Sequence, residues 1–316
     1  MSKKINEKIT ENNKIKNNKP SIPEMVVNII KNYSGLDKNR EGDTTFVIKG
    51  SKNRNKPIIL LFTGDWHIGS KSCDHDRLFS DLDYIINNID PADLRIFLLG
   101  DLIDNVGVRF KNTESVFGYI PPSIQKDVLI EVLNKISQYI DISCWGNHDI
   151  EWDEKYMGIS DLSRKLKKVS TFFYGRGLVK YNVGKQSYSV FLSHKFMGKS
   201  WFHPLQGNIR GWLESHADIV VSGHYHNFGY LNDFYGLDEN GNPMERHLIQ
   251  VGTYNYVDDR YSERYFAHPV CRNGCLILFN NIFKIMYFSD FKDGIKYYKD
   301  LINTSKSTTI NKGEKK

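Results

Sequence analysis

The chain has 316 residues, of which 40% are hydrophobic and 25% charged, so it can bury a large core and belongs to neither a collagen-like nor a fully disordered class. Its longest apolar runs are far shorter than the roughly 20 residues that a membrane-spanning helix needs. Its N-terminal region lacks the apolar core of a secretory signal. We therefore expect a cytoplasmic protein with no membrane partner. The four cysteines include no C-x2-C pair and predict free thiols rather than a disulfide framework.

The net charge of +6 is concentrated at the two ends of the chain. Residues 1–56 hold 13 Lys or Arg against 6 Asp or Glu, and residues 303–316 hold 4 against 1, which leaves the part between them with a net charge of −4. An acidic body suits a domain that binds divalent cations, and basic ends can attract a polyanion such as DNA or RNA. The alternative is that Lys and Asn only keep the ends solvated.

Three regions are expected in chain order. Residues 1–56 form a basic, partly disordered extension, in which 24–33 carries apolar residues at helical spacing and 45–48 has the pattern of a short strand. The main domain covers 57–302. Residues 303–316 are polar and basic and are expected to be a disordered tail.

Short apolar strands alternate with helical patterns in the main domain, and most of the strands end in a polar turn. Strands joined by crossover helices predict an α/β fold with a mainly parallel sheet that is covered on both faces. Ligands of such sheets bind beyond the carboxyl ends of the strands, where these polar turns fall. The predicted helices are 75–88 and 123–139, and the predicted strands are 58–63, 94–99, 140–145, 188–193, 217–222, 274–280 and 282–289.

Five polar turns hold side chains that can bind metal ions: GDWHIG at 64–69, GDLIDN at 100–105, GNHD at 146–149, SHKF at 193–196 and GHYH at 223–226. A single turn of this kind is as often a helix cap, but five together favour a site. Carboxylate, imidazole and amide ligands suit manganese, iron or zinc better than calcium. Two metals about 3.5 to 4 Å apart need a shared anionic bridge. The candidate ligands are Asp65, His67, Asp101 (the candidate bridge), Asn147, His194, His224 and His226.

The five turns, in this order, resemble the signature of the calcineurin-like metallophosphoesterases: D-x-H, GD-x-x-D, GNH-[DE], a lone His and GH-x-H. The resemblance covers about residues 57–290. It implies the α/β/β/α sandwich of that family, with a two-metal site at the C-terminal ends of the strands. It also implies which side chains bind each ion: Asp65, His67 and His226 the first, Asn147, His194 and His224 the second, with Asp101 as the bridge.

The resemblance further implies roles for two residues that are not ligands. His148 would hold the scissile phosphate and protonate the leaving oxygen, and Asp104 would orient this histidine, although Asp104 can also be read as a turn cap. The two divalent cations, with manganese expected and iron or zinc as alternatives, would activate a water for in-line attack without a covalent intermediate.

Departures from the family pattern narrow the expected substrate. Asn105 and Val106 stand where the protein serine/threonine phosphatases of the family have Arg and Gly, and the third block ends in Asp149 rather than Glu. The blocks are closer to those of DNA-repair exonucleases and phosphodiesterases. We expect a metal-dependent hydrolase of phosphate esters, best read as a phosphodiesterase and more narrowly as a DNA exonuclease. The alternatives are a phosphomonoesterase and a non-catalytic interaction scaffold, and the oligomeric state stays open.

Two other features are compatible with a nucleic-acid substrate. The connection 105–122 is long enough for a lid or a substrate loop, although a surface excursion without a function is equally compatible. Aromatic side chains at Trp201, Phe202 and within 254–265 could stack on bases, or they could simply fill the core.

Overall fold

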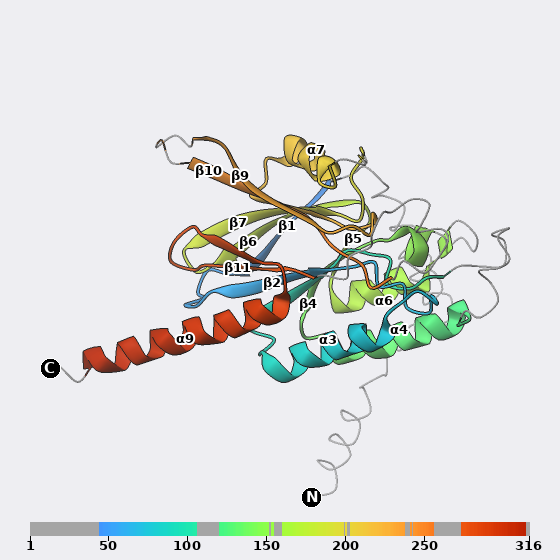
Figure 1. Ribbon diagram of the computed structural model, residues 1–316, viewed down its shortest axis with the longest axis horizontal. Coiled ribbons are helices and arrows are strands. Elements are labelled where there is room, and N and C mark those ends of the chain that lie inside the picture. Colours follow the sequence, from blue (N-terminus) through green and yellow to red (C-terminus); the bar gives the residue numbers. More distant parts are fainter. Residues whose placement is uncertain are drawn as a thin grey trace, which may run out of the picture. The chain divides into compact units, whose positions relative to one another are not determined.

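Two six-stranded β-sheets stacked face to face form the centre of the fold, and helices cover the outer face of each sheet (Figure 1). The computed structural model describes residues 44–105, 120–151, 153–154, 160–198, 200, 203–237, 241, 243–255 and 273–313. These residues all belong to the compact unit Glu41–Lys316. The expectations for residues 1–43, for 106–119 of the long connection, for Trp201 and Phe202, and for 256–265 lie outside the described residues.

The first sheet supplies most of the motif-bearing strands. In spatial order it consists of β12 (Ile285–Phe288), β11 (Cys275–Leu278), β2 (Ile58–Thr63), β3 (Leu94–Leu98), β4 (Ile140–Cys144) and β5 (Thr171–Phe173). The strands from β2 to β5 are parallel, and β11 is antiparallel to both of its neighbours. Every residue of β2 is buried, because Ile59 and Leu61 pack against helices while Leu60 and Phe62 face the other sheet.

The second sheet consists, in spatial order, of β1 (Thr44–Ser51), β6 (Arg176–Val183), β7 (Gln186–Ser193), β8 (Ile219–Ser222), β10 (Pro243–Gln250) and β9 (Gly229–Leu237). It is a mixed sheet, in which β7, β8 and β10 are parallel while β6 and β9 run antiparallel to their neighbours β7 and β10. The strand expected at 45–48 is β1. It lies ahead of the expected domain start at Pro57, yet it pairs in parallel with β6 along its whole length.

Helices form the two outer layers. α3 (His75–Asn88), α4 (Pro122–Ile136), α6 (Asp161–Val169) and α9 (Phe291–Gly313) cover the first sheet, and α7 (Gln206–Ser215) covers the second (Figure 1). The predicted amphipathic spacing explains α3, because Leu78, Leu82 and Ile85 lie on its buried face, and the side chain of Asp74 caps its N-terminus. The α/β/β/α sandwich expected from the sequence is therefore the observed fold.

Three parts of the fold differ from the expectations. The sequence predicts a mainly parallel sheet, whereas the protein has two mixed sheets. Several elements have no counterpart among the predicted ones: β5, β6, α6, α7, the β9–β10 hairpin and α9. The tail expected to be disordered from residue 303 instead continues α9 to Gly313. Phe291, Ile295 and Tyr298 anchor the first turns of α9 in the core, and further turns add to an existing helix at little free-energy cost.

Two findings bear on the class of protein. No helix in the described part of the chain is both long and apolar enough to span a bilayer. Cys73, Cys144 and Cys275 are buried free thiols, and the fourth cysteine, Cys271, lies outside the described residues.

Candidate metal centre

All nine predicted site residues come together at one edge of the sandwich, where strands of both sheets end. Asp65 and His67 follow β2, and Asp101 and Asp104 follow β3. The third block follows β4, and its last three residues open the short π-helix η4 (Asn147–Glu151). His194 follows β7, and His224 and His226 follow β8. The parallel direction of β2, β3 and β4 in one sheet, and of β7 and β8 in the other, explains why residues so distant in sequence meet.

Most of the predicted ligands have a left-handed backbone, which is rare outside glycine. Five of the seven have positive φ: Asp65 (50°), His67 (50°), Asp101 (52°), His224 (75°) and His226 (55°). Such conformations cost about 1 to 3 kcal/mol each and collect at functional sites. Each of these turns bends the chain sharply after a buried strand, so that the side chain faces the neighbouring turns.

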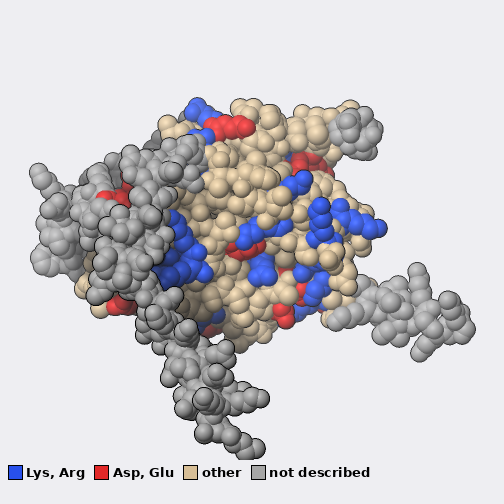
Figure 2. Space-filling view, turned by 180° about the vertical axis from the view of Figure 1, so that it is seen from behind, with Lys and Arg blue, Asp and Glu red and all other residues tan. Residues whose placement is uncertain are grey.

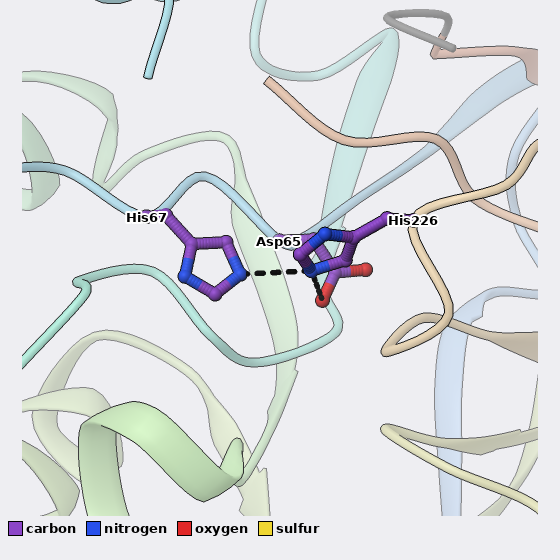
Figure 3. Close-up of side chains that lie close together, drawn as sticks. All are labelled: Asp65, His67 and His226. Atoms are coloured by element: carbon purple, nitrogen blue, oxygen red, sulfur yellow. Dashed lines mark hydrogen bonds and ion pairs between the residues drawn. The ribbon is translucent and has the colours of Figure 1, made fainter. Parts of the chain in front are cut away.

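The first cluster joins Asp65, His67 and His226 (Figure 3). The Nε2 atoms of His67 and His226 lie 2.9 Å apart, and His226 Nε2 lies 3.8 Å from Asp65 Oδ1. Asp65 Oδ1 is buried and has no hydrogen-bond partner among the described residues, whereas Oδ2 accepts the main-chain N–H of His224 at 2.8 Å. Two imidazole nitrogens and an unpaired carboxylate oxygen directed at one point form a donor set that fits a divalent cation.

The second cluster joins Asp101, His194 and His224. His194 Nε2 lies 3.2 Å from Asp101 Oδ2, 3.1 Å from Asn147 Oδ1 and 3.2 Å from His224 Nδ1. Since a carbonyl only accepts, Nδ1 of His194 must donate to Leu99 O at 2.6 Å. In the neutral ring this bond leaves the lone pair on Nε2, as a metal ligand requires.

Two buried carboxylates share the centre, and the histidine beside them titrates abnormally: against the effect of burial, Asp101 raises the pKa of His194 to about 9. Asp65 and Asp101 are buried, and no Lys or Arg in the described ranges forms an ion pair with either. Burial, together with the nearby Asp101, raises the pKa of Asp65 to about 7, against the opposing effect of His194. Burial and the neighbouring His194 lower the pKa of His224 to about 3, and burial holds the pKa of His226 well below its usual value. Both rings are therefore neutral near pH 7, the form that binds metals.

His148 lies at the edge of both clusters and is more exposed than any of the ligands that it touches. Its side chain is 21% exposed, against 2% for His67, and the two rings meet edge to face at 4.6 Å. Nδ1 of His148 donates to the main-chain carbonyl of Asp104 at 2.7 Å, while Asp104 Oδ1 lies 3.9 Å away. The Asp104 carboxylate is nearer to His67, at 3.3 Å from Nδ1. Asp104 thus contacts His148 through its main chain more closely than through the carboxylate that the sequence suggested.

Sequence reasoning missed a group of polar residues that support these turns. Asp149 is fully buried and accepts the main-chain N–H groups of Leu102 and Gly146, both at 2.9 Å, so it links the second block to the third. Burial raises its pKa to about 7. Asn105, Gln125 and Asp153 form a second linkage. Only Asp149 and Asn105 belong to a block, and nothing in the local sequence marks Gln125 or Asp153.

Solved structures similar to the chain include vacuolar protein sorting 29 from Cryptosporidium parvum, with 14% identity over 75% of this chain and 100% of that one and a TM-score of 0.42. A predicted phosphoesterase from Streptococcus pneumoniae has 13% identity over 74% of this chain and 90% of its own, with a TM-score of 0.34. A 5′-nucleotidase from Candida albicans has 12% identity over 81% of this chain and 55% of its own, with a TM-score of 0.34.

No curated protein sequence matches the chain. The family model of the calcineurin-like phosphoesterases matches residues 58–240, which span four strands of the first sheet, most of the second and all five polar turns. The chain therefore belongs to the calcineurin-like phosphoesterase family.

Proposed function

We propose that the protein hydrolyses a phosphodiester with the help of two divalent cations, expected to be manganese. The observation that carries this proposal is the convergence of two buried donor clusters, Asp65–His67–His226 and Asp101–His194–His224. Asn147 completes the second cluster. We propose Asp101 as the shared ligand, because its carboxylate contacts His194 of the second cluster and is also influenced by His67 of the first. Despite burial, His194, His148 and His67 hold the pKa of Asp101 well below its usual value. When bound, the two cations supply Lewis acidity, which activates water and neutralises phosphoryl oxygens.

His148 is the proton donor to the leaving oxygen. Its Nδ1 is held by the Asp104 carbonyl, so Nε2 is the ring atom that exchanges a proton with the substrate. Burial lowers the pKa of His148. An anionic phosphate beside the ring has the opposite effect and favours the protonated form that can donate.

A diester suits the site better than a monoester because no guanidinium stands at position 105. A monoester dianion carries more negative charge and is commonly held by Arg. Asn105 cannot replace that group, since its side-chain amide already donates to His148 O at 2.8 Å and to Asp153 Oδ1 at 2.9 Å, and the residue is buried.

A nucleic acid is the narrower substrate that we propose. Figure 2 shows Lys and Arg side chains in several groups on one face, among fewer Asp and Glu side chains. Residues 1–56 and 303–316 add a net charge of +7 and +3. Basic surfaces attract a polyanionic backbone regardless of its sequence. The corresponding test is manganese-dependent loss of label from end-labelled linear DNA, and DNA that stays intact while small diesters are cleaved would contradict this part.

The reaction class is tested with a chromogenic diester and the matching monoester. Metal-stripped protein is assayed before and after addition of Mn²⁺, with Asp101→Asn as the inactive variant. Asp161→Asn serves as the matched control, because Asp161 is an exposed residue of α6 that pairs only with Arg164 among the described residues. Faster diester turnover that needs both Mn²⁺ and Asp101 supports the proposal. Faster monoester turnover would make the protein a phosphatase, and no turnover of either ester would favour a non-catalytic scaffold.

A further inference from the structure

A polar network outside the two donor clusters connects the His148 turn to helix α4. Asn105 is its centre, and all three N–H groups of this residue are used. The main-chain N–H donates to Gln125 Oε1 at 2.8 Å, and Nδ2 donates to His148 O at 2.8 Å and to Asp153 Oδ1 at 2.9 Å. Asn105 is 8% exposed, so these bonds are shielded from water.

The backbone of Asn105 is as strained as that of the ligands, although the residue is not one of them. Its φ of 49° falls in the left-handed region, which asparagine tolerates better than most other residues. Of the seven non-glycine residues with positive φ in the described part, only Asn105 and His216 are not predicted ligands, and His216 ends helix α7. Strain of this kind persists only where the surroundings fix it, which suggests a functional reason at Asn105.

The far side of the network is equally buried and is balanced in charge. Asp153 is 4% exposed, and its Oδ2 accepts from Lys126 Nζ at 2.6 Å, so the carboxylate that faces Asn105 is neutralised by a cation on α4. Gln125, on the same first turn of α4, donates to Ile120 O at 2.7 Å. It packs so closely on Gly69 of the first block that a Cβ there would collide with its side chain. The start of α4 therefore braces two motif turns directly, and it reaches the turn of His148 through Asn105.

Asp104 and Asn105 bind His148 in a reciprocal manner. The imidazole Nδ1 donates to the carbonyl of Asp104, and the carbonyl of His148 accepts from the side chain of Asn105. One bond fixes the ring and the other fixes the main chain of the π-helical turn that carries it. Neither bond involves Asp65, Asp101 or the ligand atoms of the histidines.

We infer that Asn105, braced by Asp153 and Lys126, is a positioning residue that sets where the imidazole of His148 meets the leaving oxygen. This inference rests on the proposed function. Misplacing a reacting group by about 1 Å can cost about 10²-fold in rate. The loss should fall mainly on proton transfer, because the bonds of Asn105 reach no predicted ligand atom. The same turn carries Asn147, and the main-chain N–H of His148 donates to Asp101 Oδ1 at 2.8 Å, so manganese content must be measured in every variant.

The test compares two diesters with the same non-leaving side. One releases p-nitrophenolate, which departs without a proton, and the other releases an alkoxide, which needs one. Asn105→Gly keeps the left-handed backbone and removes the amide. It is expected to lower kcat for the alkoxide ester by about 10- to 100-fold, to change kcat for the nitrophenyl ester less than about threefold, and to leave KM and manganese content unchanged.

Further variants keep the result interpretable if Asn105→Gly folds poorly. Lys126→Met removes the brace from a partly exposed position and should show the same selective loss in weaker form. Asp153→Asn retains an oxygen that can accept from Asn105 and should restore most of the alkoxide activity that Asp153→Ala loses. Asn280→Gly is the matched control: Asn280 is also buried, but it follows Leu278, which pairs with the first residue of β2, so it lies at the end of the sheet opposite the site.

A measurement without metal or substrate completes the design. Hydrogen exchange of the amides in 147–151 should be faster in metal-free Asn105→Gly than in the metal-free wild type, and unchanged in Asn280→Gly. Equal losses for both esters, or none for either, in a variant that retains manganese would overturn the inference while leaving the proposed function intact. Absence of wild-type turnover, or turnover that does not need His148, would instead overturn the proposed function.

Discussion

Replacing His247 with glutamine should remove one defined part of the acid sensitivity of the fold, separate from that of the metal centre. His247 lies on β10 with 1% exposure, its Nδ1 is 2.9 Å from Tyr230 Oη, and its main-chain N–H donates to Asp218 O. The nearest acidic side chain, Glu245, is 3.6 Å from Nε2 but is 40% exposed. Burial lowers the pKa of His247 from 6.5 to about 4.

The direction of the effect follows from proton linkage. Between pH 6.5 and 4 the unfolded chain binds a proton at this residue and the folded chain does not, so the stability present above pH 6.5 is lost as the pH falls. The full pKa shift of His247 corresponds to at most about 3 kcal/mol of the free energy of unfolding. About 2 kcal/mol of this is lost between pH 7 and pH 5.

Urea unfolding of the wild type and of His247→Gln at pH 7 and pH 5 measures this difference. We expect the wild type to lose about 2 kcal/mol more than the variant on acidification. Tyr230→Phe is the control. It removes the hydrogen bond to His247 but leaves the imidazole of His247 buried, so this variant should retain the pH dependence of the wild type. Equal losses in the wild type and His247→Gln would refute the reasoning.

Three further predictions concern the site and the core. His148→Ala should lower turnover of an alkoxide-releasing diester by about 10²- to 10⁴-fold without loss of bound manganese, measured by steady-state kinetics and metal analysis; an unchanged rate would remove His148 from the reaction. Gly146→Ala should reduce manganese content and thermal stability together, because the new Cβ collides with Asp101 and lies 2.8 Å from Asp149 Oδ1; normal metal binding would show that this turn can shift. Leu60→Ala, fully buried between the sheets, should lower the free energy of unfolding by about 2 to 5 kcal/mol in urea titrations, and a loss below about 1 kcal/mol would mean that the intersheet core repacks.

Elements with a strong local pattern could be predicted from the sequence. β2 and α3 have the predicted bounds, because an uninterrupted apolar run and a helical apolar spacing identify each of them. The partnership of β1 with β6 could not be predicted, since parallel pairing joins Thr44 to Arg176 across a long stretch of chain. The β9–β10 hairpin was missed because its exposed half has no strict alternation of apolar and polar residues.

The candidate site likewise contains residues that the sequence predicts and residues that only the tertiary fold reveals. The ligand-bearing turns were predictable because each follows a buried strand within a few residues, and parallel strands bring such turns together. Gln125 and Asp153 were not, because one lies on a helix and the other in a segment without a recognised motif, and only the tertiary fold brings them to Asn105. The same limit applies to Asp104, whose main-chain carbonyl contacts His148 where the sequence suggested its carboxylate.

The most direct test of the central claim is a titration of metal-free protein with Mn²⁺ that follows bound metal and diester turnover in the same samples. Two equivalents should bind, turnover should rise as they bind, and Asp101→Asn should lose both, whereas Asp161→Asn should lose neither. Diester turnover that is as fast without metal, or as fast in Asp101→Asn, would contradict the two-metal phosphodiesterase proposed for this site.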